Sequence, residues 1–250
     1  MDTTLTSPSL GVLDTLRTIS EFLSGREQAT KTAIRNSLEL TEEAVTAAIE
    51  FGSTNGFLER REYNYIKLLA PYQISEDAFY PCVELALCEL WRSDGYADHS
   101  FYLEKTARRD SKIVGPWTRP DFTMVSHKKY PWTIGHEFDV VTFEVKRPDS
   151  CNVLAVFEAL SHSSNATRAY VVFPINEDNW MEYEPAQAGR VKDECSRHGV
   201  GLILIEDPYD APTPRYLLKA ERREIDHAKC SDFLGAVLSD DGKKMISGWK

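Results

Sequence analysis

The chain has 250 residues, of which 42% are hydrophobic and 27% charged, and its formal net charge is −10. This length suits one large globular domain, or a medium domain with a small one. The acidic balance counts against tight nonspecific binding of nucleic acid, which usually requires a basic surface. No apolar run approaches the roughly 20 residues of a membrane helix, so we expect no membrane association.

The cysteines and the N-terminus indicate a cytoplasmic protein. The chain has five cysteines, an odd number, and no pair has CxxC spacing. These features are typical of a reduced intracellular chain. The first residues, MDTTLTSPSLGVLDTL, lack a basic segment followed by an apolar stretch, so no secretory signal is evident. The scattered histidines and cysteines predict no zinc site.

Residues 1–72 have the pattern of a small helical domain that ends in a hairpin. Leucine and isoleucine recur at three- and four-residue steps after residue 10, which predicts a helix ending at Gly25. A short second helix is expected around residues 30–38, and a third from Glu42 to about Ser53, with Thr41 as its cap. The segment FLERREYNYIKLLAP then predicts two short strands.

Three helices followed by a hairpin resemble a winged helix-turn-helix domain, whose third helix would read DNA. Glu42 and Glu43 in the first turn of that helix suit the helix dipole but would face phosphates unfavourably. Two interpretations stay open, sequence recognition and a dimerisation or partner-docking module, and the glutamates slightly favour the second. Five basic side chains remain as possible phosphate contacts: Lys31, Arg35, Arg60, Arg61 and Lys67.

Residues 73–250 alternate helices with apolar strands, which predicts an α/β domain with a mixed sheet. Helices are expected at residues 79–92, 153–167 and 185–197, and strands at residues 111–114, 121–125, 138–146, 168–173 and 200–205. The last forty residues are expected to be helical in part.

The strand VVTFEVK carries two charged residues where a buried strand is expected. Side chains alternate along a strand, so Phe143 and Val145 should face the core while Glu144 and Lys146 share the other face. A plain salt bridge at a sheet edge is the simpler interpretation. Because burial makes such a pair costly, a functional site explains it better.

A second carboxylate precedes the short strand DFTMV, at Asp121. If this strand pairs antiparallel with VVTFEVK, Asp121 and Glu144 converge, and a divalent cation relieves their repulsion. Hard oxygen ligands favour Mg²⁺ or Mn²⁺, which acidifies a bound water and stabilises charge on phosphorus. Lys146 could position or help to deprotonate that water.

Pro120-Asp121 followed by Glu144-Val145-Lys146 resembles the PD-(D/E)xK signature of the restriction-endonuclease-like nucleases. The motif is short and occurs by chance in other chains, but both halves lie in expected strands. The resemblance implies a mixed central sheet flanked by helices, and a further acid from the helix upstream. It assigns catalysis to Asp121, Glu144, Lys146 and Glu84, and the metal to Asp121, Glu144, Glu84 and Val145.

The resemblance also implies a helix that lines the cleft after the second motif. One face of that helix carries the polar residues Glu158, Ser161, His162 and Asn165, and the opposing face the apolar residues Val153, Val156, Phe157 and Leu160. A local basic stretch could hold phosphates, although a solvated surface is its usual role. The expected nucleic-acid contacts are Arg108, Arg109, Lys112, Arg119, His162 and Asn165.

The sequence therefore predicts a Mg²⁺-dependent deoxyribonuclease, an endonuclease acting as a homodimer. By analogy alone, it would serve a prokaryotic restriction or anti-phage defence system, and a larger complex with a partner ATPase or helicase is compatible with the acidic charge. The alternative is a DNA-binding, regulatory or adaptor protein whose winged helix is the active part and whose nuclease-like domain is a scaffold.

Overall fold

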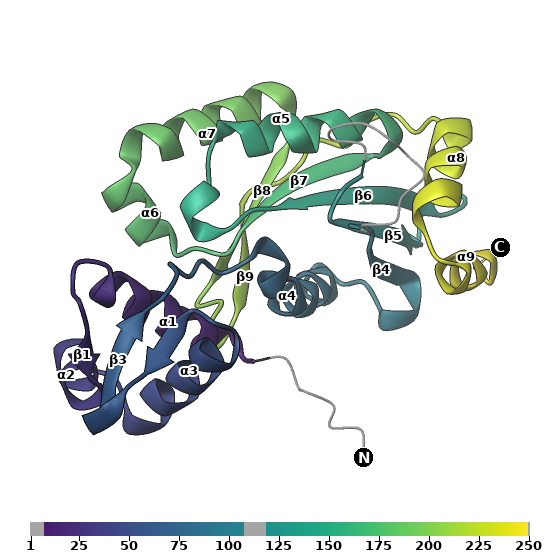
Figure 1. Ribbon diagram of the computed structural model, residues 1–250. Helices are drawn as coiled ribbons and strands as arrows, with labels where there is room; N and C mark the ends of the chain where they lie inside the picture. The colour runs from purple at the N-terminus through teal and green to yellow at the C-terminus, as the bar shows by residue number, and fades with distance from the viewer. Residues whose placement is uncertain (1–7, 108–118, 250) are drawn as a thin grey trace, which may run out of the picture. The chain divides into compact units, whose positions relative to one another are not determined.

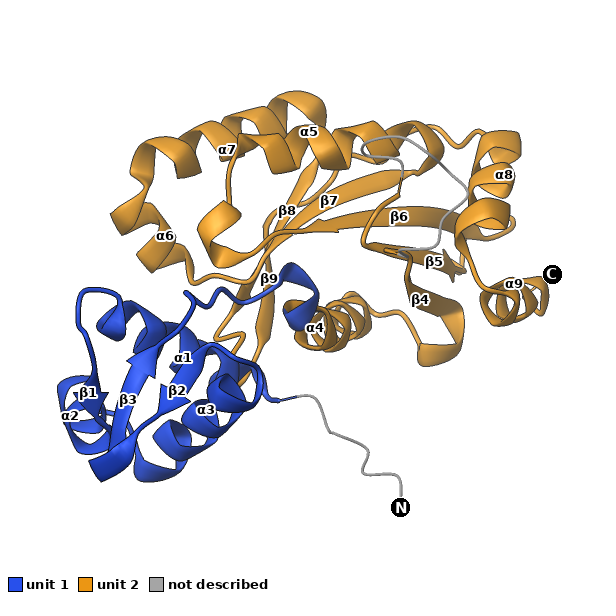
Figure 2. Ribbon diagram, in the orientation of Figure 1, with its two compact units in different colours: residues 1–78 blue, residues 79–250 orange. Residues whose placement is uncertain are grey.

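The computed structural model of the protein describes residues 8–107 and 119–249 (Figure 1). The chain forms two compact units, residues 1–78 and residues 79–250 (Figure 2). The sequence led us to expect the domain boundary after residue 72. Among the described residues, no helix is both long and apolar enough to cross a membrane.

The first unit combines three helices with a small antiparallel sheet. Its elements are α1 (Leu10–Leu23), β1 (Ala29–Thr30), α2 (Lys31–Ser37), α3 (Glu42–Thr54), β2 (Leu58–Arg60) and β3 (Tyr65–Leu68), and the strand order is β1-β3-β2. The helices begin where side-chain oxygens of Ser9, Thr30 and Thr41 accept backbone N–H groups of the first turn. These caps explain why each helix begins where the sequence predicts.

The core of the first unit lies between α1, α3 and the sheet. Leu16, Ile19 and Val45 are fully buried there. Gly52 permits the close approach of α3, because a Cβ at this position would lie 2.8 Å from side-chain atoms of both Leu16 and Leu58. The amphipathic pattern of the helices therefore has its expected packing partners.

The second unit is mixed α/β, with a six-stranded mixed sheet in the order β4-β5-β6-β7-β8-β9. The strands are β4 (Phe101–Lys105), β5 (Phe122–Lys128), β6 (Glu137–Val145), β7 (Arg168–Phe173), β8 (Gly201–Glu206) and β9 (Thr213–Leu218). Strands β4, β5 and β6 pair antiparallel, β6, β7 and β8 pair parallel, and β9 is antiparallel to β8. Residues 129–136 connect β5 to β6, so these two strands form a hairpin.

Helices cover both faces of this sheet (Figure 1). The helices are α4 (Tyr80–Ser93), α5 (Val153–His162), α6 (Glu177–Tyr183), α7 (Pro185–His198), α8 (His227–Val237) and α9 (Asp240–Ser247). Helices α5 and α7 lie on one face, and α4 lies on the other, where Trp91 packs against Phe143 and Tyr170. Thus β6 is enclosed from both sides, which is why a charged pair on it is unusual.

Several elements differ from those expected. Strands β4 and β9 and helix α6 were not predicted, and they have partly exposed residues that weaken a hydrophobic pattern. Helix α5 ends at His162, and a separate 3-10 turn follows over Ser163–Asn165, where a helix to residue 167 was expected. The strand expected at residues 111–114 lies outside the described residues.

Candidate active site

Asp121 and Glu144 lie at the same end of two adjacent antiparallel strands. Phe122 pairs with Phe143 at the last step of the β5–β6 ladder, and Asp121 and Glu144 are the next residues of the two strands. Beyond that step the pairing is irregular, because the Asp121 N–H donates to the Phe143 carbonyl at 3.0 Å and its carboxyl accepts from the Val145 N–H. Both carboxyls therefore lie at the same end of the sheet, where the charge of Asp121 helps to raise the pKa of Glu144.

Two hydrogen bonds fix the Asp121 carboxyl. Its Oδ1 accepts from the Tyr80 hydroxyl at 2.5 Å, and its Oδ2 accepts from the Val145 N–H at 2.8 Å. Asp121 is 8% exposed, and burial raises its pKa, whereas these two hydrogen bonds act in the opposite direction. The Asp121 side chain is therefore held by Tyr80 of α4 and by the backbone of β6.

Lys146 joins the second carboxyl to helix α5. Its Nζ lies 2.6 Å from Glu144 Oε1 and also 2.6 Å from Glu158 Oε2. Glu144 and Lys146 meet because residues two apart on an extended chain share a face. Helix α5 packs over that face and supplies Glu158. The carboxyls of Glu144 and Glu158 thus flank the Lys146 ammonium, and all three groups are mostly withdrawn from solvent.

The electrostatics of Glu144 are unusual for a glutamate. Burial, followed by the charge of Asp121, raises its pKa to about 8, although Lys146 opposes this shift. Two carboxyls at one place in a poorly solvated site disfavour double ionisation. Without a further positive charge, the site therefore favours a protonated Glu144 at neutral pH.

His162 lies beside the same carboxyl, on the buried stripe of α5. It is 4% exposed, its Nε2 lies 3.5 Å from Glu144 Oε2, and this nitrogen makes no hydrogen bond. Burial lowers the pKa of His162 to about 4, so the ring is neutral at physiological pH. The sequence grouped His162 with Ser161 as one polar face, but Ser161 is exposed and His162 is enclosed.

The structure brings only part of the expected set together. Glu84 lies on the exposed side of α4, and Tyr80, one turn earlier, is the α4 residue that contacts Asp121. Asn165 lies in the turn after α5, and its carbonyl accepts from the Cys230 thiol at 3.3 Å. Arg119 donates to the Ala236 carbonyl at 3.3 Å. Arg108, Arg109 and Lys112 lie outside the described residues.

Tyr80 was missed by the sequence reasoning, and Glu158 received no role beyond a place on the cleft-lining face. Tyr80 had one available signal, since a tyrosine on the buried stripe of a helix requires a partner for its hydroxyl. Glu158 had a weaker signal, because its place on the polar face of the following helix could not identify which strand residue it meets.

The donor set at this site fits a hard divalent cation. Among the described residues, no group of three or more His, Cys, Asp or Glu side chains is placed to hold a metal ion. Mg²⁺, however, commonly takes one or two carboxylates and completes its shell with water and phosphate oxygens. Asp121 and Glu144 could supply those carboxylates, and the pKa of both groups is raised, mainly by burial. Val145 could add only its carbonyl oxygen.

Comparisons with known proteins yield no family for this chain. No protein-family profile and no curated protein matches it. One similar solved structure is the SPO1766 protein of unknown function from Silicibacter pomeroyi, with 13% identity, a TM-score of 0.33, and coverage of 59% of this chain and 78% of that chain. Another is TrmBL2, an archaeal chromatin protein whose structure shows a novel mode of DNA binding, with 10% identity, a TM-score of 0.23, and coverage of 94% and 91%. Likenesses of this strength carry no conclusion about fold or function.

Proposed function

We propose that the protein is a divalent-metal-dependent nuclease of the PD-(D/E)xK type that hydrolyses DNA internally. The observation that carries the proposal is the convergence of Asp121 and Glu144 at one end of the sheet, with Lys146 2.6 Å from Glu144. The order of these residues in the chain matches the motif, and their strands are antiparallel neighbours, as convergence requires.

Each residue of the site has a defined role in this proposal. Asp121 and Glu144 hold the cation, and the Tyr80 hydroxyl keeps Asp121 oriented. Bound there, Mg²⁺ or Mn²⁺ would supply positive charge for the phosphate oxygens and acidify water. Lys146 hydrogen-bonds the attacking water and directs it in line with the phosphorus. Glu158 holds the Lys146 ammonium in place, and neutral His162 excludes water from the inner side of Glu144.

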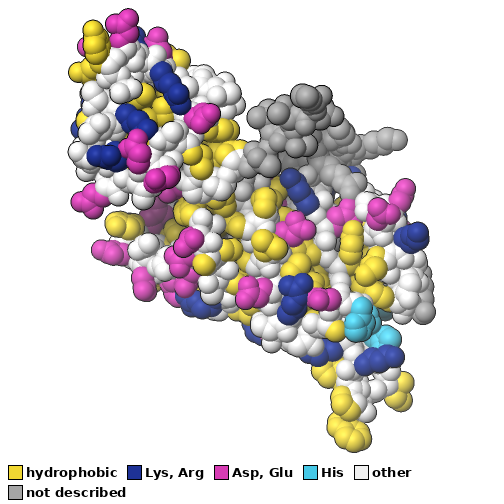
Figure 3. Space-filling view, turned by 90° about the horizontal axis from the view of Figure 1, so that it is seen from below, with side chains coloured by type: hydrophobic (Ala, Val, Ile, Leu, Met, Phe, Trp, Pro, Cys, Tyr) yellow, Lys and Arg dark blue, Asp and Glu magenta, His cyan; other side chains and the backbone are white. Residues whose placement is uncertain are grey.

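We assign the first unit to the winged helix-turn-helix class, because its elements run α1-β1-α2-α3-β2-β3 and its three strands form one antiparallel sheet. Its role is to place the protein on DNA or to bind a partner. Glu42 lies 2.6 Å from Lys31 Nζ and 3.1 Å from Arg35 Nη1, so the basic groups of α2 are already partly neutralised. On the face in Figure 3, Lys and Arg side chains are interspersed with Asp and Glu rather than gathered into one basic patch.

A second candidate function is a DNA-binding, regulatory or adaptor protein with a nuclease-like scaffold, and this neutralisation favours the adaptor among these roles. A protein partner, such as an ATPase or helicase, tolerates an acidic first turn of α3 better than DNA does. The two functions are compatible if the partner recruits the nuclease. A homodimer that cuts both strands and a role in prokaryotic antiviral defence belong to the same proposal.

Cleavage of supercoiled plasmid tests the proposal, because a closed circle has no ends and only an endonuclease can cut it. We expect wild-type protein to nick or linearise the plasmid with Mg²⁺ or Mn²⁺ and to be inactive in EDTA. Lys146→Ala should reduce cutting by at least about a hundredfold, given the usual contribution of a residue that assists proton transfer. The matched control is Lys229→Ala, which removes a 65% exposed lysine of α8.

The same assay separates the alternatives. If neither wild type nor Lys146→Ala cuts with either metal, while a mobility-shift assay shows DNA binding, the regulatory or adaptor function replaces the nuclease. Equal cutting by wild type and Lys146→Ala would contradict the assigned site. If the protein cleaves only single-stranded RNA, in a parallel assay with an RNA oligonucleotide, the proposed hydrolysis stands and its substrate is RNA instead of DNA.

A further inference from the structure

The hairpin between β5 and β6 presents large apolar side chains to solvent. All of its connecting residues, 129–136, are exposed. Trp132 is 95% exposed, and Ile134, two residues further, is fully exposed. Single apolar residues on a surface are common, but a fully exposed tryptophan and isoleucine on one short connection are typical of an interaction surface.

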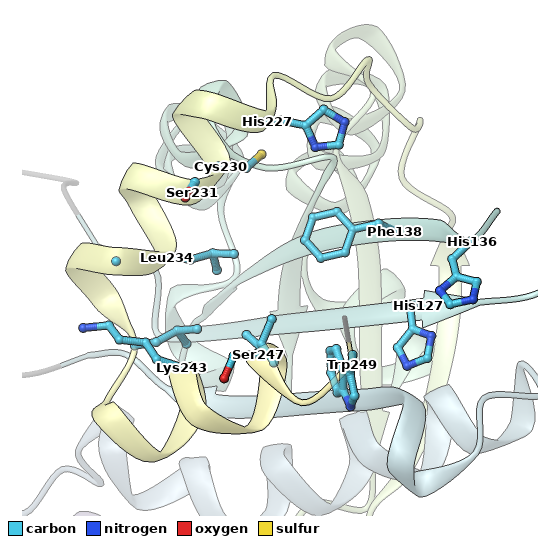
Figure 4. Close-up of a pocket in the computed structure, with 13 residues that line it drawn as sticks. His127, His136, Phe138, His227, Cys230, Ser231, Leu234, Lys243, Ser247 and Trp249 are labelled. Carbon is cyan, nitrogen blue, oxygen red and sulfur yellow. The ribbon is translucent and has the colours of Figure 1, made fainter.

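An apolar pocket lies at the base of the same hairpin, between β5, β6, α8 and α9 (Figure 4). It measures about 500 Å³, and pockets of about 300–1,000 Å³ hold drug-sized molecules, so it has room for an indole ring. Its lining residues Gly235 and Lys243 are exposed, so it opens to solvent. The apolar members of its lining are Phe138, Leu234, Leu238, Ile246 and Trp249.

The positions of the pocket and of the hairpin tip suit a two-fold arrangement. His127 and His136 line the pocket where the two strands enter the hairpin, and Trp132 lies five residues beyond His127, at most about 17 Å away. When two such hairpins lie side by side in opposite directions, the tip of each reaches the base of the other. One two-fold axis therefore brings both tips to both pockets, and such a contact closes at two copies.

The area and charge of this contact also suit two copies of the chain. Trp132 alone can bury about 150–250 Å². With Ile134 and the pocket wall that both cover, one hairpin buries roughly 600 Å², and the two-fold axis doubles this to about 1,200 Å², the lower limit of stable specific interfaces. Neither residues 129–136 nor the described lining of the pocket includes Asp or Glu, so the net charge of −10 is not concentrated at the contact.

We propose that the hairpin and the pocket form a reciprocal interface between two copies of this chain, in which Trp132 of each copy enters the pocket of the other. Ile134 packs at the rim of the same pocket. This inference rests on the homodimer of the proposed function and names its contact surface. Its test uses neither metal nor DNA, so a failed interface leaves the assignment of Asp121 and Glu144 to the plasmid assay.

Sedimentation velocity of the full-length protein in EDTA, over a range of protein concentrations, tests the interface. We expect wild-type protein to dimerise reversibly. Trp132→Ala should raise the dissociation constant of the dimer at least about a hundredfold, because each dimer loses two buried aromatic anchors. Tyr183→Ala removes a 77% exposed aromatic residue of α6 and is the matched control, which should dimerise like wild type. A wild type that stays monomeric at about 100 μM, or unchanged dimerisation of Trp132→Ala, would refute the interface.

A pocket variant shows whether the hairpin of one copy meets the pocket of another. Gly235→Leu should block the pocket and weaken the dimer as Trp132→Ala does, because a Cβ at Gly235 has no atom within 4 Å and its side chain extends into open space. Gly189→Leu in α7 also has open space and should dimerise normally.

Mixing the two defective variants gives the sharpest result. In a heterodimer of Trp132→Ala with Gly235→Leu, one intact hairpin still meets one intact pocket. The mixture should therefore associate about tenfold more tightly than either variant alone, since it loses one anchor instead of two. A mixture that associates no better than its components would overturn the reciprocal contact. Monomeric wild type that binds phosphatidylglycerol vesicles through Trp132 would also overturn it and assign the hairpin to a lipid surface.

Discussion

Replacing Glu144 by glutamine should stabilise the metal-free protein while destroying its proposed activity. The pKa of Glu144 is raised from 4.5 to about 8 by burial and by Asp121. At about 1.4 kcal/mol per pKa unit, ionising this carboxyl in the native state disfavours folding by at most about 5 kcal/mol above pH 8. Lys146 keeps Glu158 as a partner at 2.6 Å, so the variant leaves no unpaired ammonium.

The sign of the pH dependence follows from the raised pKa. A carboxyl with a raised native pKa contributes stability that is fully present below about pH 4.5 and is lost as the pH rises through about 8. Glutamine has no such titration. The stability difference between Glu144→Gln and wild type should therefore grow from pH 5 to pH 8.5. Because the repulsion is shared with Asp121, we expect a gain of about 1–3 kcal/mol at pH 8.5.

Urea unfolding in EDTA, followed by tryptophan fluorescence, measures this difference. All five tryptophans lie beyond residue 78 in the sequence, so the signal reports on the second unit alone. Glu89→Gln on the exposed side of α4 is the matched control and should change stability by less than about 0.5 kcal/mol. Added Mg²⁺ should stabilise the wild type more than Glu144→Gln. A Glu144→Gln protein that is less stable than wild type at pH 8.5 in EDTA would refute this electrostatic account.

Three further predictions test other parts of the structure. Tyr80→Phe removes a hydrogen bond that lowers the pKa of Asp121. Plasmid cleavage by this variant should need about tenfold more Mg²⁺ for its half-maximal rate, and an unchanged Mg²⁺ requirement would contradict the role assigned to Tyr80. Gly201→Ala would place a Cβ 2.2 Å from the Tyr170 ring and 2.8 Å from the Ala220 backbone nitrogen, and urea unfolding should show a free energy of unfolding lower by about 1–3 kcal/mol. A neutral result would mean that both neighbours move aside without cost. Glu42→Gln frees Lys31 and Arg35 of α2 from their ion pairs with Glu42. DNA binding measured by fluorescence anisotropy should become about threefold to tenfold tighter at low salt, and the gain should be smaller at high salt. An unchanged affinity would favour a protein partner for the first unit.

Local signals in the sequence were sufficient for most elements of the fold. Helix α3 begins after Thr41, the N-cap that the sequence predicts. Helix α7 ends one residue beyond the expected residue 197, at Gly199, which has a left-handed φ of 65°. The apolar run of β7 begins and ends at the expected residues, because a strand buried on both faces has a continuous hydrophobic pattern. Caps, glycines and buried runs are properties of a few neighbouring residues, so one sequence is enough to detect them.

The contacts of the site were only partly predictable. The alternation of VVTFEVK placed Glu144 and Lys146 on one face, and their 2.6 Å contact follows from that alternation alone. The partners Tyr80 and Glu158 come from helices on either side of the sheet, and their contacts depend on how each helix docks. The edge strand β9 was missed for a related reason, since its residues are partly exposed and its pairing with β8 is non-local.

The two faces of β6 illustrate why packing alone does not account for the acid cluster. On one face, Val141, Phe143 and Val145 are fully buried and apolar, as expected for positions that serve only the stability of the fold. On the other face, Glu144 lies at nearly the same depth, at 8% exposed, beside a lysine and near an aspartate. Replacing such buried charges by apolar residues of similar size is often neutral or stabilising. A strand that keeps them on one face while its other face is apolar therefore carries a requirement beyond folding, and the cation that we propose between Asp121 and Glu144 would meet it.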